Sequence, residues 1–303
     1  MALAALGLGT APIGNMFTGV TEDDAQATVD AAWDAGFRYF DTAPFYGYGI
    51  AEERLGRALR ARPRDEYILA TKVGRVLEPA GAARAETIFR DVGAVEPRFD
   101  YSRDGVLRSF EESLRRLDTD RIDVLLVHDP DLHEDDALRT AFPTLLELRE
   151  QGAISWVGCG MNQYQMLSRF VARVDLDCVL LAGRYTLLDR SGAPLLEQCA
   201  ERGVRVVLGG VFNTGILIDP GAGATYDYTR APDDVLQRAR RLRDACEARG
   251  IALGAAALQF AQRHRAVHTV LIGARSAAEI ATDAAFAAPR IDDAVLADVA
   301  ATA

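Results

Sequence analysis

The chain contains few of the residues from which disulfide frameworks and metal centres are built. Only four cysteines and four histidines occur among its 303 residues. No two cysteines have CxxC spacing, so we expect reduced, buried thiols in a cytoplasmic protein. His264 and His268 have i,i+4 spacing, but a predicted helix-to-strand turn separates them and no HExxH motif accompanies them. The sequence therefore predicts no metal site.

Excess basic charge and long apolar runs are also lacking. The formal net charge is −10 and the pI is about 5.0, whereas a nucleic-acid-binding domain normally presents a basic surface. No apolar run approaches the ~20 residues of a membrane-spanning helix. The apolar start, residues 1–7, is short and has no basic region before it, so it is not typical of a signal peptide. We expect neither a nucleic-acid partner nor a membrane partner.

Three common catalytic or nucleotide-binding patterns are missing as well. Residues 7–12 (GLGTAP) lack the third glycine of GxGxxG, and Pro12 would disrupt the helix that such a motif opens. No GxSxG is present, which argues against a serine hydrolase. Asp41 and Asp129 could form a glycosidase pair, but a glycosidase needs no lysine and phenol beside its carboxylates.

What the chain does contain is a regular alternation of short apolar runs and helical patterns. Thr21, Ser102, Asn162 and Ser276 are the predicted N-caps of four of the helices. Strands are predicted at residues 6–9, 37–41, 67–72, 122–128, 154–159, 176–181, 204–208 and 267–272. Helices are predicted at residues 22–35, 51–61, 103–117, 135–151, 163–173, 191–202, 232–249, 254–264 and 277–285.

Eight strand–helix units with short connections predict a single α/β domain over residues 1–303, a (β/α)8 TIM barrel. Length and composition agree, since 49% of the residues are hydrophobic and 26% are charged. Two loops are longer than usual, residues 74–101 and 209–231. Both follow strands, so both should lie over the C-terminal mouth of the barrel as lids or substrate walls.

Three polar residues end apolar runs, and a fourth follows closely: Asp41, Lys72, His128 and Tyr46. In a parallel barrel the C-terminal strand ends meet at one mouth, where such enzymes build their active sites. Taken singly, each residue has a structural alternative: a cap, an ion-pair lysine, an interior histidine or a loop aromatic. All four at matching positions predict an active site for proton transfer to or from an oxygen atom.

The chemistry of these four side chains suggests a different role in proton transfer for each of them. Tyr46 would be the acid or base, and a nearby Lys72 ammonium would lower the pKa of its phenol. Asp41 would hold and orient Lys72, while His128 would hydrogen-bond the substrate oxygen. Together they would protonate a carbonyl oxygen as hydride arrives at carbon, or take the hydroxyl proton as hydride leaves. Arg75 and Asp129 are candidates for substrate contact or for a structural ion pair.

Three segments resemble the aldo-keto reductase signatures: residues 40–52 (FDTAPFYGYGIAE), 70–74 (ATKVG) and 126–128 (LVH). The resemblance extends from residues 7–10 (GLGT) to 272–276 (IGARS). It implies a TIM barrel, a nicotinamide cofactor and a catalytic tetrad at Asp41, Tyr46, Lys72 and His128.

Within the family, residues 9–15 (GTAPIGN), 73–75 (VGR), 128–131 (HDPD) and 183–189 (GRYTLLD) resemble the bacterial aldose 1-dehydrogenase branch. That branch includes L-fucose and D-threo-aldose dehydrogenases and pyridoxal 4-dehydrogenase. The resemblance implies oxidation of an L-fucose-, D-arabinose- or L-galactose-type aldose at C1 to the aldonolactone. Alternatives are an NADPH-dependent aldehyde or ketone reductase, a pyridoxal 4-dehydrogenase and a nucleotide-binding regulatory subunit.

The expected cofactor contacts depart from the family pattern. The serine and asparagine that usually hold the carboxamide are replaced by Gly160 and Met161, with Asn162 next. The usual glutamine becomes Ala182, and the stacking tyrosine becomes Gly209 or Gly210. Asn162 and Phe212 are the candidates to rebuild these contacts.

The remaining cofactor candidates surround the phosphates and the adenosine ribose. They are Thr10, Asp41, Gly210, Asn213, Gly273, Arg275 and Glu279. Glycine-rich turns expose N–H groups to a pyrophosphate, and the helix after Gly273 adds an N-terminus. Glu279 occupies a place where many NADPH-using relatives have arginine, and a carboxylate accepts bonds from a ribose 2′-hydroxyl but repels a 2′-phosphate. We therefore expect NAD, with NADP as the alternative.

Overall fold

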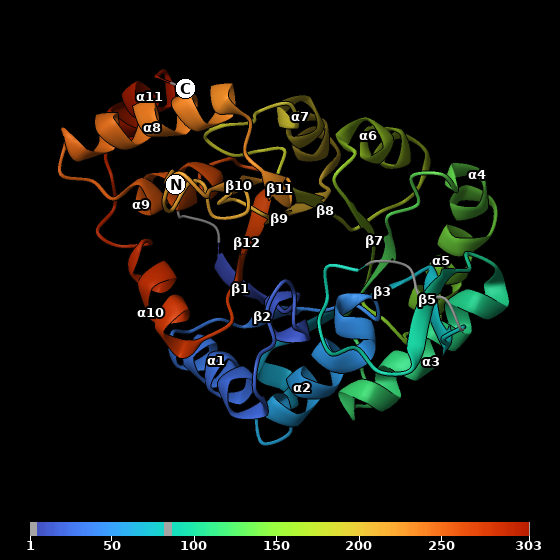
Figure 1. Ribbon diagram of the computed structural model, residues 1–303. Coiled ribbons are helices and arrows are strands. Elements are labelled where there is room, and N and C mark those ends of the chain that lie inside the picture. Colours follow the sequence, from blue (N-terminus) through green and yellow to red (C-terminus); the bar gives the residue numbers. More distant parts are fainter. Residues whose placement is uncertain (1–4, 82–86, 303) are drawn as a thin grey trace.

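The computed structural model describes residues 5–81 and 87–302. Eight parallel strands close into a barrel in the order β1-β12-β9-β8-β7-β6-β3-β2, and helices surround it (Figure 1). These strands are β1 (Ala5–Gly9), β2 (Tyr39–Asp41), β3 (Ile68–Val73), β6 (Val124–His128), β7 (Trp156–Met161), β8 (Cys178–Ala182), β9 (Arg205–Gly209) and β12 (Val267–Gly273). The predicted (β/α)8 fold is confirmed.

The helices follow the predicted pattern with small shifts at their ends. They are α1 (Glu22–Asp34), α2 (Ile50–Leu59), α3 (Arg103–Leu117), α4 (Glu134–Asp136), α5 (Phe142–Glu150), α6 (Tyr164–Arg173), α7 (Ala193–Arg202), α8 (Asp233–Glu247), α9 (Leu253–Ala261), α10 (Ala277–Ala285) and α11 (Asp293–Ala300). The side chains of Thr21, Ser102 and Ser276 each accept a hydrogen bond from the N–H three residues on, as predicted. Asn162 is not a cap, because α6 begins only at Tyr164.

The helix predicted over residues 135–151 is interrupted, and the helix α11 was not predicted. A π-helical turn, Ala137–Ala141, separates α4 from α5, with Phe142 donating its N–H to the carbonyl of Ala137. Pro143 follows directly and has no N–H to donate to the preceding turn. The proline thus accounts for a local break in the α-helical hydrogen-bond ladder.

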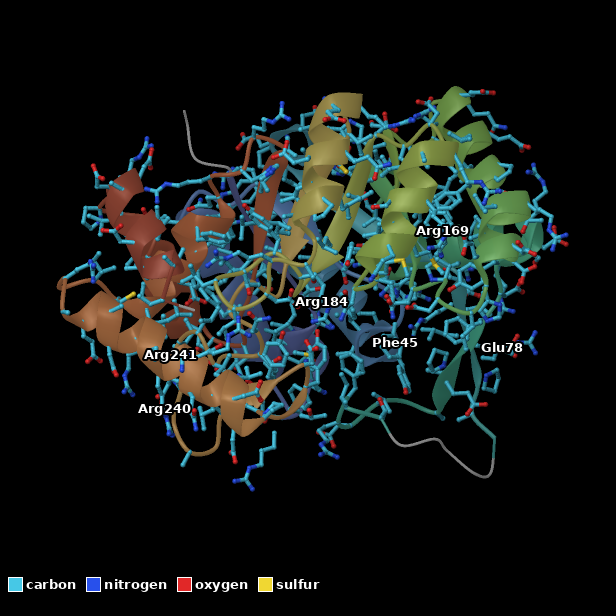
Figure 2. All side chains as sticks on the ribbon, turned by 90° about the horizontal axis from the view of Figure 1, so that it is seen from above. Phe45, Glu78, Arg169, Arg184, Arg240 and Arg241 are labelled. Carbon is cyan, nitrogen blue, oxygen red and sulfur yellow. The ribbon has the colours of Figure 1, made fainter. Side chains whose placement is uncertain are left out.

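Both long loops contain a small antiparallel hairpin at the C-terminal end of the barrel. The first holds β4 (Arg75–Pro79) paired with β5 (Val95–Phe99), and residues 82–86 lie outside the described residues. The second holds β10 (Thr225–Tyr226) paired with β11 (Thr229–Arg230). In the side view of Figure 2, Phe45, Glu78 and Arg184 lie at the end of the barrel where these loops gather.

The barrel interior below the mouth is filled by apolar side chains with one tyrosine. This inner cluster is Tyr39, Ala70, Val124, Leu126, Cys178, Leu180, Val207 and Leu271. The four cysteines are buried free thiols, as predicted. No helix within the described residues is long and apolar enough to cross a membrane, and no group of three or more His, Cys, Asp or Glu side chains there could hold a metal ion.

Candidate active site

The barrel brings the four predicted residues together at its C-terminal mouth. Asp41 ends β2, Lys72 is the penultimate residue of β3 and His128 ends β6. The relative exposures of these three residues are only 2%, 1% and 5%. Tyr46 follows β2 at the start of a short 3-10 helix, Tyr46–Gly49. The four residues lie together because the carboxyl ends of parallel strands share one rim of the barrel.

Lys72 is held by two oxygen acceptors from the end of β2. Its Nζ donates to Asp41 Oδ2 at 2.7 Å and to the carbonyl oxygen of Thr42 at 2.8 Å. Burial raises the pKa of Asp41, and the nearby Lys72 charge opposes that rise. Asp41 Oδ1 is buried without a hydrogen-bond partner among the described residues. The predicted ion pair is therefore present, with one acceptor oxygen unused.

The ring of Tyr46 lies close to both Lys72 and His128. Lys72 Nζ is 4.6 Å from the ring centroid, and the His128 ring is 5.8 Å away at 89°. Gly47 permits this placement: its φ is +63°, and a Cβ there would lie 2.4 Å from the carbonyl oxygen of Gly14. A side chain at this position would push the tyrosine loop away from the β1–α1 loop.

The expectation that the pKa of Tyr46 is lowered overall is wrong for this form of the site. Burial raises the pKa of the Tyr46 phenol well above its usual value, and the charges of Asp41 and Asp129 add to the rise. The Lys72 ammonium instead contacts the ring face and is already bonded to Asp41. The phenol is thus a proton donor at neutral pH, and its use as a base is favoured as pH rises.

His128 is a neutral side chain in this environment. Burial lowers its pKa well below the usual value, and the Lys72 and Arg75 charges lower it further. Its Nδ1 is buried without a partner in the described part of the chain, and its Nε2 lies 3.4 Å from Asp129 Oδ2. A neutral imidazole can donate a hydrogen bond without transferring charge.

Arg75 and Asp129, the candidate substrate contacts, form an ion pair beside His128. Arg75 Nη2 is 2.8 Å from Asp129 Oδ2, and its guanidinium lies over the rings of Phe45 and Phe99 at 4.1 and 4.7 Å. Burial raises the pKa of Asp129, against the effect of Arg75. The pair gives the rim of the site both a donor and an acceptor.

An aromatic wall that the sequence pattern did not predict surrounds Tyr46. Phe89 contacts Phe45 edge-on at 5.3 Å and also meets Tyr46 and Tyr48, at 6.4 and 6.2 Å between centroids. Backbone bonds hold it in place: the N–H of Phe17 donates to the Ile88 carbonyl, and that of Arg90 to the Asn15 carbonyl. Phe89 lies in a long loop with no periodic pattern, so only the pairing of two distant loops identifies it.

The far side of the mouth supplies candidate cofactor contacts. Thr10 and Asn213 are 0% and 2% exposed, yet Thr10 Oγ1 and Asn213 Oδ1 have no hydrogen-bond partner within the described residues. Asn213 Nδ2 donates to the carbonyl of Gly183 at 3.2 Å. Gly210 has φ +62°, and Asn162 is half-buried just past β7. Buried polar atoms without partners are typical of a surface that meets a polar ligand.

The residues that replace the usual carboxamide and stacking contacts are small and lie at the ends of neighbouring strands. Ala182 and Gly209 face each other in register, and a Cβ on Gly209 would lie 3.7 Å from that of Ala182. A Cβ on Gly160 would lie 3.6 Å from Lys72 Cε. None of these residues places a bulky side chain at the mouth, so the residues present are compatible with a nicotinamide there.

The remaining cofactor candidates already have structural contacts. Glu279 accepts the Arg275 N–H at 2.9 Å and forms an ion pair with its side chain at 3.3 Å, at the start of α10. Gly273 is exposed at the end of β12. Phe212 packs against Phe286 at 6.3 Å between centroids. Phe212 thus has a hydrophobic partner in the fold, and Glu279 is a capping residue as well as a candidate ribose contact.

Comparison with known proteins places this site in a family. The family model described as "Aldo/keto reductase family" matches residues 5–303. The chain belongs to this family. It is accordingly an NAD(P)-dependent oxidoreductase with a small-molecule substrate, as the sequence predicted.

Two curated relatives and one solved structure illustrate the similarity. The chain is 39% identical to a D-threo-aldose 1-dehydrogenase of a Pseudomonas species, over 99% of this chain and 94% of that protein. It is 42% identical to a pyridoxal 4-dehydrogenase of Microbacterium luteolum, over 92% and 88%. The holo form of an aldo-keto reductase from Bacillus halodurans superposes with a TM-score of 0.79 at 25% identity, over 100% and 94%.

Proposed function

We propose that this enzyme oxidises an aldose of the L-fucose, D-arabinose or L-galactose type at C1 to the aldonolactone, using NAD. The observation that carries the proposal is the buried Lys72–Asp41 pair below the ring of Tyr46, with a neutral His128 beside it. Similarity to a D-threo-aldose 1-dehydrogenase supports the choice of substrate. We further propose one domain over residues 1–303 and a cytoplasmic location, which four unpaired cysteines favour.

A nicotinamide held at this mouth would supply the acceptor for the hydride that leaves C1. Tyr46 takes the proton of the C1 hydroxyl in this direction and returns it in the reverse direction. His128 orients that oxygen through a hydrogen bond. The positive charge of Lys72, 4.6 Å from the Tyr46 ring centroid, stabilises the phenolate that oxidation requires, and Asp41 holds Lys72 in place.

The residues that would hold the cofactor follow or end β1, β7, β8, β9 and β12. Gly160, Ala182 and Gly209 leave room for the nicotinamide, and Asn162 is the candidate for its carboxamide. Thr10 and Asn213 carry unused buried acceptors for its polar groups. The phosphates would meet N–H groups near Gly210 and Gly273. Glu279 favours a ribose 2′-hydroxyl over a 2′-phosphate, with NADP as the alternative through Arg275.

Oxidation of pyridoxal is the second candidate function. The relative at 42% identity is a pyridoxal 4-dehydrogenase, and the wall of Phe45, Tyr48 and Phe89 would suit an aromatic ring. Reduction of aldehydes or ketones by NADPH uses the same four residues in the opposite direction. A nucleotide-binding regulatory role would make no use of the Tyr46 hydroxyl.

The test is nicotinamide absorbance with L-fucose, L-galactose, D-arabinose and pyridoxal, each with NAD and with NADP. We expect NAD reduction by L-fucose or D-arabinose. Tyr46→Phe should lower kcat by about 10³-fold, because it removes the acid–base group, while cofactor binding measured by fluorescence persists. No sugar oxidation, with NADPH oxidation by simple aldehydes, would refute the dehydrogenase proposal. An unchanged rate in Tyr46→Phe would refute the role of the tyrosine.

A further inference from the structure

Tyr101 bonds to the backbone of the strand end that carries His128. The residue is 3% exposed, and its hydroxyl lies 2.6 Å from the carbonyl oxygen of His128 and 3.0 Å from that of Asp129. A single hydroxyl hydrogen is thus shared between two consecutive carbonyl groups. The proposed chemistry uses no atom of Tyr101, so this contact requires its own explanation.

The two carbonyl groups flank a residue with an unusual backbone conformation. Asp129 has φ +42°, in a region that few residues other than glycine adopt. The His128 carbonyl belongs to the peptide plane before the Asp129 Cα, and the Asp129 carbonyl to the plane after it. A donor that binds both oxygens fixes the relative orientation of the two planes, and therefore the backbone angles of Asp129.

The residue with this backbone conformation, Asp129, places its carboxylate beside the imidazole of His128. Asp129 Oδ2 is 3.4 Å from His128 Nε2 and 2.8 Å from Arg75 Nη2. The other imidazole nitrogen, Nδ1, is buried and has no hydrogen-bond partner among the described residues. A neutral imidazole carries one hydrogen, and an acceptor beside one nitrogen favours the tautomer with the hydrogen there.

We propose that Tyr101 and Asp129 are positioning residues for His128. Tyr101 holds Asp129 in its left-handed conformation, and the Asp129 carboxylate then keeps the imidazole hydrogen on Nε2. A substrate oxygen that approaches Nε2 of His128 can then accept a hydrogen bond from the Nε2–H group. In the other tautomer it would face the lone pair of Nε2. The consequence for catalysis rests on the proposed function, whereas the tautomer is a property of the free protein.

The surroundings of Tyr101 show that its position is constrained from several sides. A Cβ on Gly74, just past β3, would lie 2.2 Å from the Tyr101 ring, so that close approach requires glycine. Phe99 stacks on the ring at 6.0 Å, and Thr140 Oγ1 donates to the Tyr101 carbonyl at 2.7 Å. The hydroxyl is therefore presented to the carbonyls by a rigid ring rather than by a mobile side chain.

The test is ¹⁵N NMR of the imidazole nitrogens in the free protein, because the two tautomers give different nitrogen shifts. The chain has only four histidines, and His128→Gln assigns the relevant pair of signals. We expect the Nε2–H tautomer in the native protein and a mixture of tautomers in Tyr101→Phe. Asp129→Ala should give the same mixture without touching Tyr101.

Asp129→Asn separates the effect of the backbone conformation and acceptor oxygen of residue 129 from the effect of its negative charge. Asparagine also tolerates positive φ, and its side-chain oxygen can still accept a hydrogen bond, so the Nε2–H tautomer should persist. Alanine supplies neither property. If only the negative charge mattered, the asparagine and alanine variants would show the same tautomer mixture, and that result would overturn the proposal.

Kinetics supply a second readout that a purely structural role would not give. Tyr101→Phe should lower kcat roughly tenfold, the effect of one lost hydrogen bond, and change KM less. Tyr67→Phe is the matched control, because Tyr67 directly precedes β3 at the end of the strand away from the mouth, and it should leave kcat unchanged. A native-like tautomer in both Tyr101→Phe and Asp129→Ala would refute the proposal. Failure of the enzyme to oxidise any aldose would instead refute the proposed substrate and leave the tautomer result standing.

Discussion

Two buried ion pairs lie on opposite sides of β3, and they differ in how fully their polar atoms are used. Towards the surrounding helices, Glu52 accepts hydrogen bonds from Thr71 Oγ1 at 2.7 Å and from Arg116 Nε at 2.6 Å. Towards the mouth, Asp41 Oδ2 accepts from Lys72 at 2.7 Å, but Asp41 Oδ1 has no partner in the described part of the chain. Thr71 and Lys72 are consecutive, so the strand itself sends them to opposite faces.

The Glu52–Arg116 pair joins elements of the fold, whereas the Asp41–Lys72 pair has an atom available for chemistry. Glu52 belongs to α2, Arg116 to α3 and Thr71 to β3, so the first pair connects two helices and the sheet with both carboxylate oxygens bonded. The Asp41–Lys72 pair keeps an unused acceptor, and its lysine Nζ lies 4.6 Å from the centroid of the Tyr46 ring. An unused buried acceptor lowers stability and therefore favours a functional explanation.

Lys72→Met should have the largest effect of these variants, because it removes the cation of the Asp41–Lys72 pair. Methionine fills similar space but removes the charge next to Tyr46, so kcat should fall by about 10³-fold. The stability loss should be modest, because burial already raises the pKa of Asp41 and the unpaired carboxyl can take up a proton. Steady-state rates and thermal unfolding of the same sample test both statements.

Glu52→Gln should show the opposite profile. The amide cannot replace the charge that Arg116 faces, so the free energy of unfolding should fall by about 2 kcal/mol. The rate constant kcat should stay within about twofold, because catalysis is not expected to use Glu52. Urea unfolding and kinetics measure the two effects. A stable but inactive Glu52→Gln would show that the two pairs do not have separate roles.

Asp283 on α10 is a buried carboxylate that forms no ion pair within the described residues, and its replacement should have the smallest effect. Burial, with Glu279 adding, raises its pKa to about 6, above its unfolded value of about 3.9. The folded state binds the proton more tightly, so this group's destabilisation is full above pH ~6 and disappears below pH ~4. Asp283→Asn should therefore stabilise the protein by about 1–2 kcal/mol at pH 7.

The pH dependence of that difference is the decisive measurement. Melting temperatures of the native protein and Asp283→Asn should converge as the pH falls from 7 towards 4. A constant gap over this range would mean that packing, not charge, distinguishes the two proteins. Because only the difference is compared, titration of the other carboxylates cancels.

The order of elements and the meeting of the four central residues could be predicted from the sequence. Apolar runs that end in Asp41 and His128, with helical patterns between them, dictate parallel strands whose ends share a rim. Capping residues such as Ser102 placed helix starts correctly, because a side-chain cap is a local interaction. Asn162 was misassigned because a helix can begin after such a residue without using it, and the sequence pattern does not distinguish the two cases.

Local sequence determined which side chains this protein presents and on which strand end each one lies. Tertiary structure alone decided how they act on one another. The pKa of Tyr46 depends on burial and on charges from other segments of the chain, so the local expectation of a lowered value was wrong. Phe89 reaches Tyr46 through the pairing of two loops, and Tyr101 reaches the carbonyls of residues 128 and 129 across the barrel rim. Periodicity and spacing describe contacts along one segment, whereas these contacts exist only after distant segments are packed together.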